Sequence, residues 1–174
     1  MTYGTLREYV IGLGANLGDR LQSLRSAVEE LADLGEIRAI SALYESKAVG
    51  PPQPDYYNAA VSLATDRDPF DLLEALHRIE QKHGRLRRER WGPRTLDLDI
   101  LWAGEVVVDT DRLRVPHPEL AQRPFALDPL LDVAADANEP NGGDRYRAIR
   151  ARLDGSEVHR IAGTEDGQWA RSDR

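Results

Sequence analysis

Two aspartates with a single residue between them are the side chains of this sequence best suited to hold a metal ion. They are Asp97 and Asp99, in the alternating polar and apolar run 95–101. Successive side chains of a β-strand point to opposite faces, so a strand here places both carboxylates on one face, about 7 Å apart at their Cα atoms. The opposite face carries Leu96, Leu98, Ile100 and Trp102.

Carboxylates this close repel one another unless a cation lies between them. Mg²⁺ prefers carboxylate oxygens and takes its remaining ligands from water and substrate phosphates. The pair therefore predicts a Mg²⁺ site. The alternative, which the aspartates alone leave open, is a half-exposed strand with an acidic outer face.

A basic segment directly precedes the two aspartates. Residues 78–94 contain seven Lys and Arg against two Glu, in a chain with 23 basic and 30 acidic residues and a net charge of −7. Guanidinium groups next to a metal site favour a metal-bound phosphate compound, although a solvated helix end carries a similar charge. Nucleic-acid binders are usually basic overall, and this chain has a pI near 5.1. A small phosphate compound is the predicted ligand, and nucleic acid is not.

Length and composition indicate one globular unit. The 174 residues contain no cysteine, which excludes disulfides and thiolate-bound metals, and four histidines without a His-x-x-x-His pair. We expect one domain over residues 1–163 and a flexible tail over 164–174. No apolar run is long enough for a membrane span and no signal-peptide core is present, so we expect a cytoplasmic protein without a membrane partner.

The order of predicted elements indicates an α+β fold. Asp19 and Asp68 are predicted to cap two helices, the second with Pro69 in its first turn. Strands are expected over 8–13, 37–44, 56–64 and 95–101, with the helices after the first and third strands. This βαββαβ order is the ferredoxin-like pattern, an antiparallel-rich sheet with helices packed on one face and an open cleft on the other.

Weaker signals follow the fourth strand. We expect a hairpin through Gly104 and 106–108, short helices at 119–122 and 126–135, a polar break at 138–144 and a last helix over 146–153. The glycines at 12, 14 and 18 have the wrong spacing for a dinucleotide fingerprint. His117, between two prolines, is either a packing residue or a phosphate contact.

Five motifs together resemble the 6-hydroxymethyl-7,8-dihydropterin pyrophosphokinases of folate synthesis. They are Gly-Ala-Asn-Leu-Gly-Asp at 14–19, Asp-Tyr-Tyr-Asn at 55–58, Gly-Arg at 84–85, Arg-Trp-Gly-Pro-Arg-Thr-Leu-Asp-Leu-Asp-Ile at 90–100 and Val-Pro-His-Pro at 115–118. The resemblance implies an α+β enzyme that uses ATP and two Mg²⁺ ions to pyrophosphorylate a pterin and release AMP. We expect the protein to be a monomer. A metal-dependent phosphohydrolase of a small nucleotide and a nucleotide-binding module without catalysis are the alternatives.

The resemblance also implies a role for each matching residue. Asp97 and Asp99 become the Mg²⁺ ligands, and Arg85 and Arg94 act on the phosphates. The implied ATP-binding residues are His77, Glu80, Ile100, Arg112, Leu113, His117 and Arg123. The implied pterin-binding residues are Ser46, Val49, Gly50, Tyr56, Asn58, Trp91 and Phe125, with Tyr56 and Phe125 on the two faces of the ring. Lys47 and Ala48 depart from the family, which often has proline at the position of Ala48.

Overall fold

A six-stranded antiparallel sheet forms the centre of the computed structural model, which describes residues 4–84 and 95–171. Four of its strands follow the order β5-β1-β4-β3, and β8 extends the edge beyond β3, while β2 pairs with another part of β4. The strands are β1 (Arg7–Ala15), β2 (Glu36–Ile40), β3 (Tyr44–Ser46), β4 (Tyr56–Thr65), β5 (Asp97–Trp102) and β8 (Val158–Arg160). The predicted ferredoxin-like α+β arrangement is confirmed, because β5 and β4 flank β1 and the helices α1 and α2 make the two crossovers.

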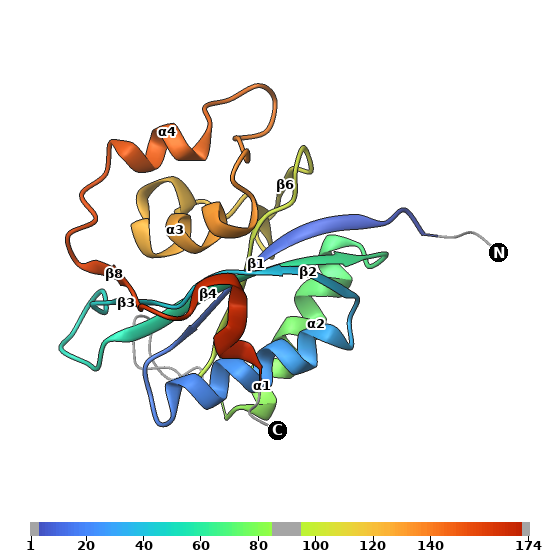
Figure 1. Ribbon diagram of the computed structural model, residues 1–174. Helices are drawn as coiled ribbons and strands as arrows, with labels where there is room; N and C mark the ends of the chain where they lie inside the picture. Colours follow the sequence, from blue (N-terminus) through green and yellow to red (C-terminus); the bar gives the residue numbers. More distant parts are fainter. Residues whose placement is uncertain (1–3, 85–94, 172–174) are drawn as a thin grey trace.

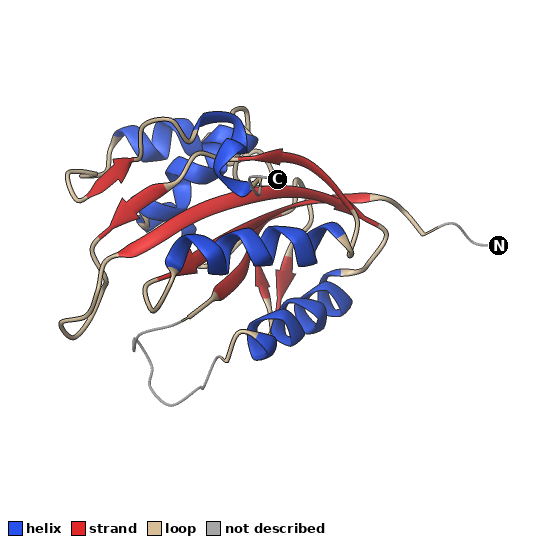
Figure 2. Cartoon of the chain, turned by 60° about the horizontal axis from the view of Figure 1, so that its bottom comes forward, coloured by secondary structure: helices blue, strands red, loops and turns tan. Residues whose placement is uncertain are grey.

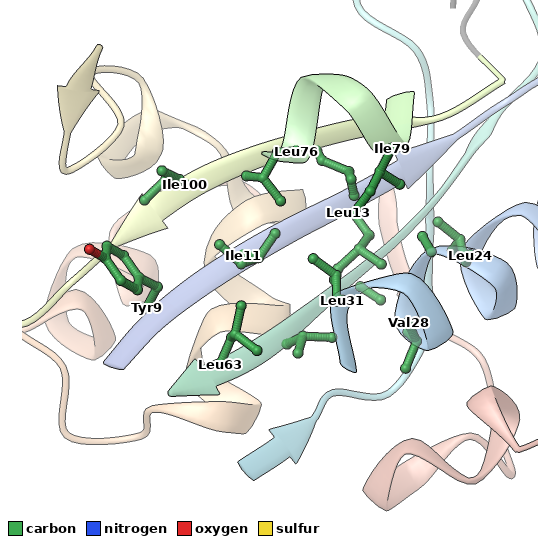
Figure 3. Close-up of a cluster of buried hydrophobic side chains, with 14 of the residues drawn as sticks. Tyr9, Ile11, Leu13, Leu24, Val28, Leu31, Leu63, Leu76, Ile79 and Ile100 are labelled. Carbon is green, nitrogen blue, oxygen red and sulfur yellow. The ribbon is translucent and has the colours of Figure 1, made fainter. Parts of the chain in front are cut away.

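Helices α1 (Arg20–Ala32) and α2 (Pro69–Lys82) cover one face of the sheet (Figures 1 and 2). Both begin where predicted, because Asp19 accepts a hydrogen bond from the backbone N–H of Gln22, and Asp68 accepts from those of Phe70 and Asp71. Their apolar stripes meet the buried residues of β1, β4 and β5 in the main core. Figure 3 shows this core, with Leu24, Leu31, Leu76 and Ile79 from the helices against Ile11, Leu63 and Ile100 from the strands.

The opposite face of the sheet is partly covered, which corrects the expectation that it is free. Helices α3 (Pro124–Val133) and α4 (Tyr146–Ala151) lie over it (Figure 1). Val10, Ala60 and Leu101 point to this side and form a second core with Leu127 and Leu130. Apolar side chains on that face need cover from water, and the uncovered remainder of the face forms a cleft.

Two strand predictions were wrong in detail, and both errors arise at irregular pairings. The strand expected over 37–44 is interrupted after Ile40, where the Ser41 hydroxyl, in place of a strand carbonyl, accepts the Ala60 N–H at 2.8 Å. Trp102 was expected on the same face as Ile100. A register shift at Val10/Ile11 leaves Leu101 as an extra residue, so Trp102 packs against the second core instead.

The predicted hairpin is also displaced. The two-stranded sheet forms between β6 (Val108–Asp109) and β7 (Arg114–Val115). Its turn is closed by the Thr110 N–H donating to the Leu113 carbonyl at 3.0 Å. Beyond it, the short helices η1 (Leu120–Gln122), α3 and α4 lie close to the predicted positions.

The C-terminal segment is packed rather than frayed. Residues 164–171 were expected to belong to a flexible tail, and this prediction is wrong for them. They contain the 3-10 segment η2 (Glu165–Ala170), in which the Trp169 side chain is only 5% exposed and joins the main core. Within the described ranges 4–84 and 95–171, no helix has the length and apolarity to cross a membrane.

Candidate functional site

A cleft of about 600 Å³ lies over the uncovered part of the sheet. Asp97 and Asp99 line it from β5, and in the neighbouring strand β1 they pair with Gly14 and Gly12. A Cβ atom at Gly12 would lie 3.0 Å from the Leu101 side chain. Gly12 therefore allows the Leu101 side chain to approach the backbone of β1 closely.

Most residues implied to bind a pterin line this cleft. They are Ser46, Val49, Tyr56, Asn58 and Phe125. The Asn58 side-chain amide donates to the Ser46 hydroxyl at 2.8 Å. Both side chains are buried, at 7% and 4% exposure, so this bond sets the orientation of the Asn58 amide. Gly50, also implied to close the pocket, is not among the described residues that line it.

A second hollow, of about 350 Å³, adjoins the first. It is lined by six of the seven residues implied to bind ATP: His77, Glu80, Ile100, Arg112, Leu113 and His117. The seventh, Arg123, lines the first cleft, where it bonds to the Glu119 carboxylate. The two hollows share Asp99, Arg114, His117 and Pro118. Two molecules bound in them would therefore meet beside the paired aspartates.

His117 is oriented by the chain around it. Its Nδ1 accepts the backbone N–H of Glu119 at 3.2 Å, which assigns the ring proton of the neutral form to Nε2. Burial lowers the pKa of His117 below its ordinary value, the positive charge of Arg123 lowers it further, and Glu119 and Asp97 act against this. A neutral imidazole with one N–H is thus available at the junction of the hollows. This agrees with a phosphate contact, one of the two alternatives raised by the sequence.

Two basic residues in the site had no role assigned from the sequence. Arg114 lines both hollows and forms an ion pair with Asp109 at 3.3 Å, and Lys47 lines the first cleft. The available signal for Arg114 was its position directly before the Val-Pro-His-Pro motif. Arg85, Trp91 and Arg94 lie outside the described residues, and their roles stay predictions.

The donor set at the cleft floor suits Mg²⁺ better than a metal held by protein alone. In the described part of the chain, no three or more His, Cys, Asp or Glu residues are grouped as a metal site. A pair of carboxylates leaves coordination positions for water and substrate phosphates, as Mg²⁺ sites commonly do.

Comparison with known proteins agrees with this geometry. A sequence model of the family 7,8-dihydro-6-hydroxymethylpterin-pyrophosphokinase (HPPK) matches residues 10–135. The chain belongs to the HPPK family. A 2-amino-4-hydroxy-6-hydroxymethyldihydropteridine pyrophosphokinase from Synechocystis sp. is 43% identical over 155 residues, 88% of this chain and 80% of that protein. One from Pseudomonas aeruginosa is 44% identical over 140 residues, 79% of this chain and 86% of that protein.

The fold is also that of solved HPPK domains. A crystal structure of Plasmodium falciparum HPPK-DHPS with pterin and p-hydroxybenzoate matches 95% of this chain with a TM-score of 0.72 at 15% identity. The chain spans 48% of that longer protein. At this identity the likeness concerns the fold, and it agrees with the α+β arrangement described above.

Proposed function

We propose that this protein transfers the pyrophosphoryl group of ATP to the hydroxymethyl oxygen of 6-hydroxymethyl-7,8-dihydropterin in folate synthesis. The products are AMP and 6-hydroxymethyl-7,8-dihydropterin pyrophosphate. One observation carries the proposal: two adjoining hollows, lined by the residues implied for pterin and for ATP, share Asp99. Membership of the HPPK family supports the same reaction.

The larger cleft is the proposed pterin site. Tyr56 and Phe125 offer aromatic faces to a flat heterocycle, and the Asn58 amide, oriented by Ser46, offers a hydrogen-bonding edge. Stacking between rings contributes about 0.5–1.5 kcal/mol beyond the burial of apolar area. The site therefore favours a planar ring with polar edges.

The smaller hollow is the proposed ATP site. Leu73, Ile100 and Leu113 supply apolar contacts for a nucleoside, while His77 and Glu80 supply polar ones. Arg112 and the Nε2–H of His117 are directed to the phosphates in this proposal. The Arg112 guanidinium donates a hydrogen bond to the Glu74 carboxylate at 3.2 Å.

Asp97 and Asp99 would hold Mg²⁺, and we keep the predicted number of two ions as part of the proposal. Bound Mg²⁺ neutralises phosphate charge and orients the triphosphate. The protein's own contribution is to place Asp99 where the two hollows join and Asp97 beside it in the larger cleft. Because phosphoryl-type transfer depends mainly on alignment and charge neutralisation, no covalent intermediate with the protein is needed.

The proposed step is a direct displacement. The hydroxymethyl oxygen forms a bond to the β-phosphorus of ATP, and the bond from that phosphorus to the oxygen bridging to the α-phosphate breaks. AMP leaves with the bonding electrons, and the hydroxyl proton passes to solvent. Arg85 and Arg94 are proposed to stabilise the charge on the transferring group.

A phosphohydrolase would use the same carboxylates with water as the acceptor. It needs no aromatic pair, whereas Tyr56 and Phe125 line the same cleft here. This favours an organic acceptor. The monomeric state and the cytoplasmic location stay predictions from the sequence.

Product analysis with ATP, Mg²⁺ and the hydroxymethyl pterin tests the proposal. Formation of AMP together with pterin pyrophosphate is expected. ADP would indicate a simple kinase, and free phosphate without consumption of the pterin would indicate a hydrolase; either result would contradict the proposal.

A further inference from the structure

Strand β3 is held from both of its edges. On one edge it pairs with β4, where Tyr44 lies opposite Asn58 and Ser46 opposite Tyr56. On the other edge it pairs with β8, which lies beside it in Figure 1. A strand of three residues has few ladder hydrogen bonds of its own, so both neighbours contribute to its position.

Beyond β8, the C-terminal segment also contacts Leu43, the residue directly before β3. The Ile161 N–H donates to the Leu43 carbonyl at 2.8 Å, and the Leu43 N–H donates to the Thr164 hydroxyl at 3.0 Å. That hydroxyl in turn donates to the Ile161 carbonyl at 2.6 Å. Thr164 therefore closes a small ring of hydrogen bonds around Leu43.

The 3-10 segment η2 fastens the residues before Leu43. The Trp169 indole N–H donates to the Ser41 carbonyl at 2.7 Å, and Arg25 on α1 donates to the Trp169 carbonyl at 2.6 Å. Gly167 has φ 69°, and a Cβ atom there would lie 2.5 Å from the Cβ of Ile40. The segment thus fits closely along residues 40–46 and is anchored to α1.

The contacts of the C-terminal segment with β3 affect the larger cleft and not the smaller hollow. Ser46 and Lys47, at the end of β3, line the larger cleft, and Ser46 orients Asn58. The smaller hollow is lined by residues of α2, β5 and the segment 110–118. A shift of β3 would therefore disturb the larger cleft first.

The geometry points to residues 158–170 as a clamp that positions β3 for the pterin, with Thr164 and Trp169 as positioning residues. This inference rests on the proposed function, because it takes the larger cleft as the pterin site. The clamp lies beyond residues 10–135, the range that matches the family. It acts on the affinity for the pterin and leaves the ATP hollow unchanged.

Two conservative substitutions test the clamp in the full chain. Thr164→Val removes the hydroxyl that bridges Leu43 and Ile161, and Trp169→Phe removes the N–H bonded to Ser41 while keeping an aromatic ring. Two matched controls change the same chemistry elsewhere. Thr65→Val removes a hydroxyl that accepts from Arg67 and donates to Leu34, and Trp102→Phe removes an indole N–H bonded to Asn138.

The dissociation constants of the hydroxymethyl pterin and of a non-hydrolysable ATP analogue with Mg²⁺ are measured for each variant, at a temperature where all are folded. Thr164→Val and Trp169→Phe are expected to raise the pterin constant about two- to tenfold, the range for one hydrogen bond, and to change the ATP constant less than twofold. Both controls are expected to bind both ligands like the wild type. Amide exchange of residues 43–46 in the ligand-free protein is expected to quicken in the clamp variants alone.

The outcomes separate the clamp from the proposed function. If the wild type binds the pterin and the clamp variants bind it equally well, or lose pterin and ATP affinity alike, the clamp is overturned and the proposed function stands. If the wild type does not bind the pterin, both fail. Unchanged amide exchange in the clamp variants would also overturn the clamp.

Discussion

At the residue scale, the paired carboxylates decide whether the site holds a metal. We expect Asp97→Ala and Asp99→Ala each to lower turnover by about 10²-fold or more while the protein stays folded. Each change removes a proposed Mg²⁺ ligand and a repulsion between like charges, and leaves no core cavity. Steady-state assays at saturating Mg²⁺ and thermal melts measure both effects. Asp136→Ala, a surface carboxylate near Arg145, is the control, and turnover within a few-fold of wild type for both site variants would exclude the metal role.

Tyr56 and Phe125 are proposed to select the acceptor of the pyrophosphoryl group. Tyr56→Ala and Phe125→Ala are expected to weaken pterin binding about tenfold each and ATP binding less than twofold, because each removes one stacking face. Separate titration of the two ligands is the measurement. Tyr57→Ala is the control, since its ring packs against the main core and lies 3.7 Å below the Arg20 guanidinium. Equal losses for both ligands would indicate general damage to the sheet.

His117 links the site to stability at acid pH. Its pKa in the folded protein lies below the ordinary 6.5 because of burial and the charge of Arg123. Below pH 6.5 the unfolded chain therefore binds more protons at this residue than the folded protein does. The contribution of His117 to the free energy of unfolding is fully present above pH 6.5. It is lost as the pH falls from there toward the lowered pKa, by up to about 1.4 kcal/mol per pH unit.

Urea unfolding of the ligand-free protein between pH 7.5 and 5 measures this effect. The free energy of unfolding is expected to fall less steeply in His117→Asn than in the wild type. Equal slopes for the two proteins would show that His117 titrates alike in the folded and unfolded states, against this prediction.

At the scale of elements, the close approach of β2 to β4 depends on Gly35. This residue lies directly before β2, and a Cβ atom on it would lie 2.3 Å from the Ala64 carbonyl oxygen. Gly35→Ala is expected to lower the free energy of unfolding by roughly 2–3 kcal/mol, because backbone must shift to make room. Chemical denaturation measures this.

Gly104→Ala is the control that distinguishes the steric clash at Gly35 from the cost of backbone conformation alone. Gly104 has φ 60° with open space around it, so alanine there costs only the left-handed conformation, about 1 kcal/mol. If Gly35→Ala lowers the free energy of unfolding no more than Gly104→Ala does, β2 can shift without cost and is not tightly packed against β4.

At the scale of the whole molecule, the C-terminal segment belongs to the core. Trp169 is buried against the side of the sheet that carries α1 and bonds to Ser41. Trp169→Ala is expected to lower the free energy of unfolding by about 3–5 kcal/mol, the usual cost of removing a large buried aromatic side chain. Denaturant unfolding tests this. A decrease in the free energy of unfolding below about 1 kcal/mol would support the flexible tail expected from the sequence.

Local pattern alone determined the elements that carry the proposed chemistry. The alternation around Asp97 and Asp99 predicted β5 and put both carboxylates on one face, and Asp19 and Asp68 marked the starts of α1 and α2. These features depend on neighbours in the chain, such as the pleat of a strand or the first turn of a helix. The family motifs added the implied site residues, most of which line the two hollows.

Only the tertiary structure decided features that depend on distant partners. The break between β2 and β3 comes from the Ser41 hydroxyl on Ala60, and the side taken by Trp102 comes from a register shift against β1. The burial of Trp169 and the sharing of Asp99, Arg114 and His117 between two hollows likewise require chain segments that are remote in sequence. A residue's own periodicity carries no information on which remote atom will meet it, so pairing irregularities and shared cavities appear only when the sheet and its helices are assembled.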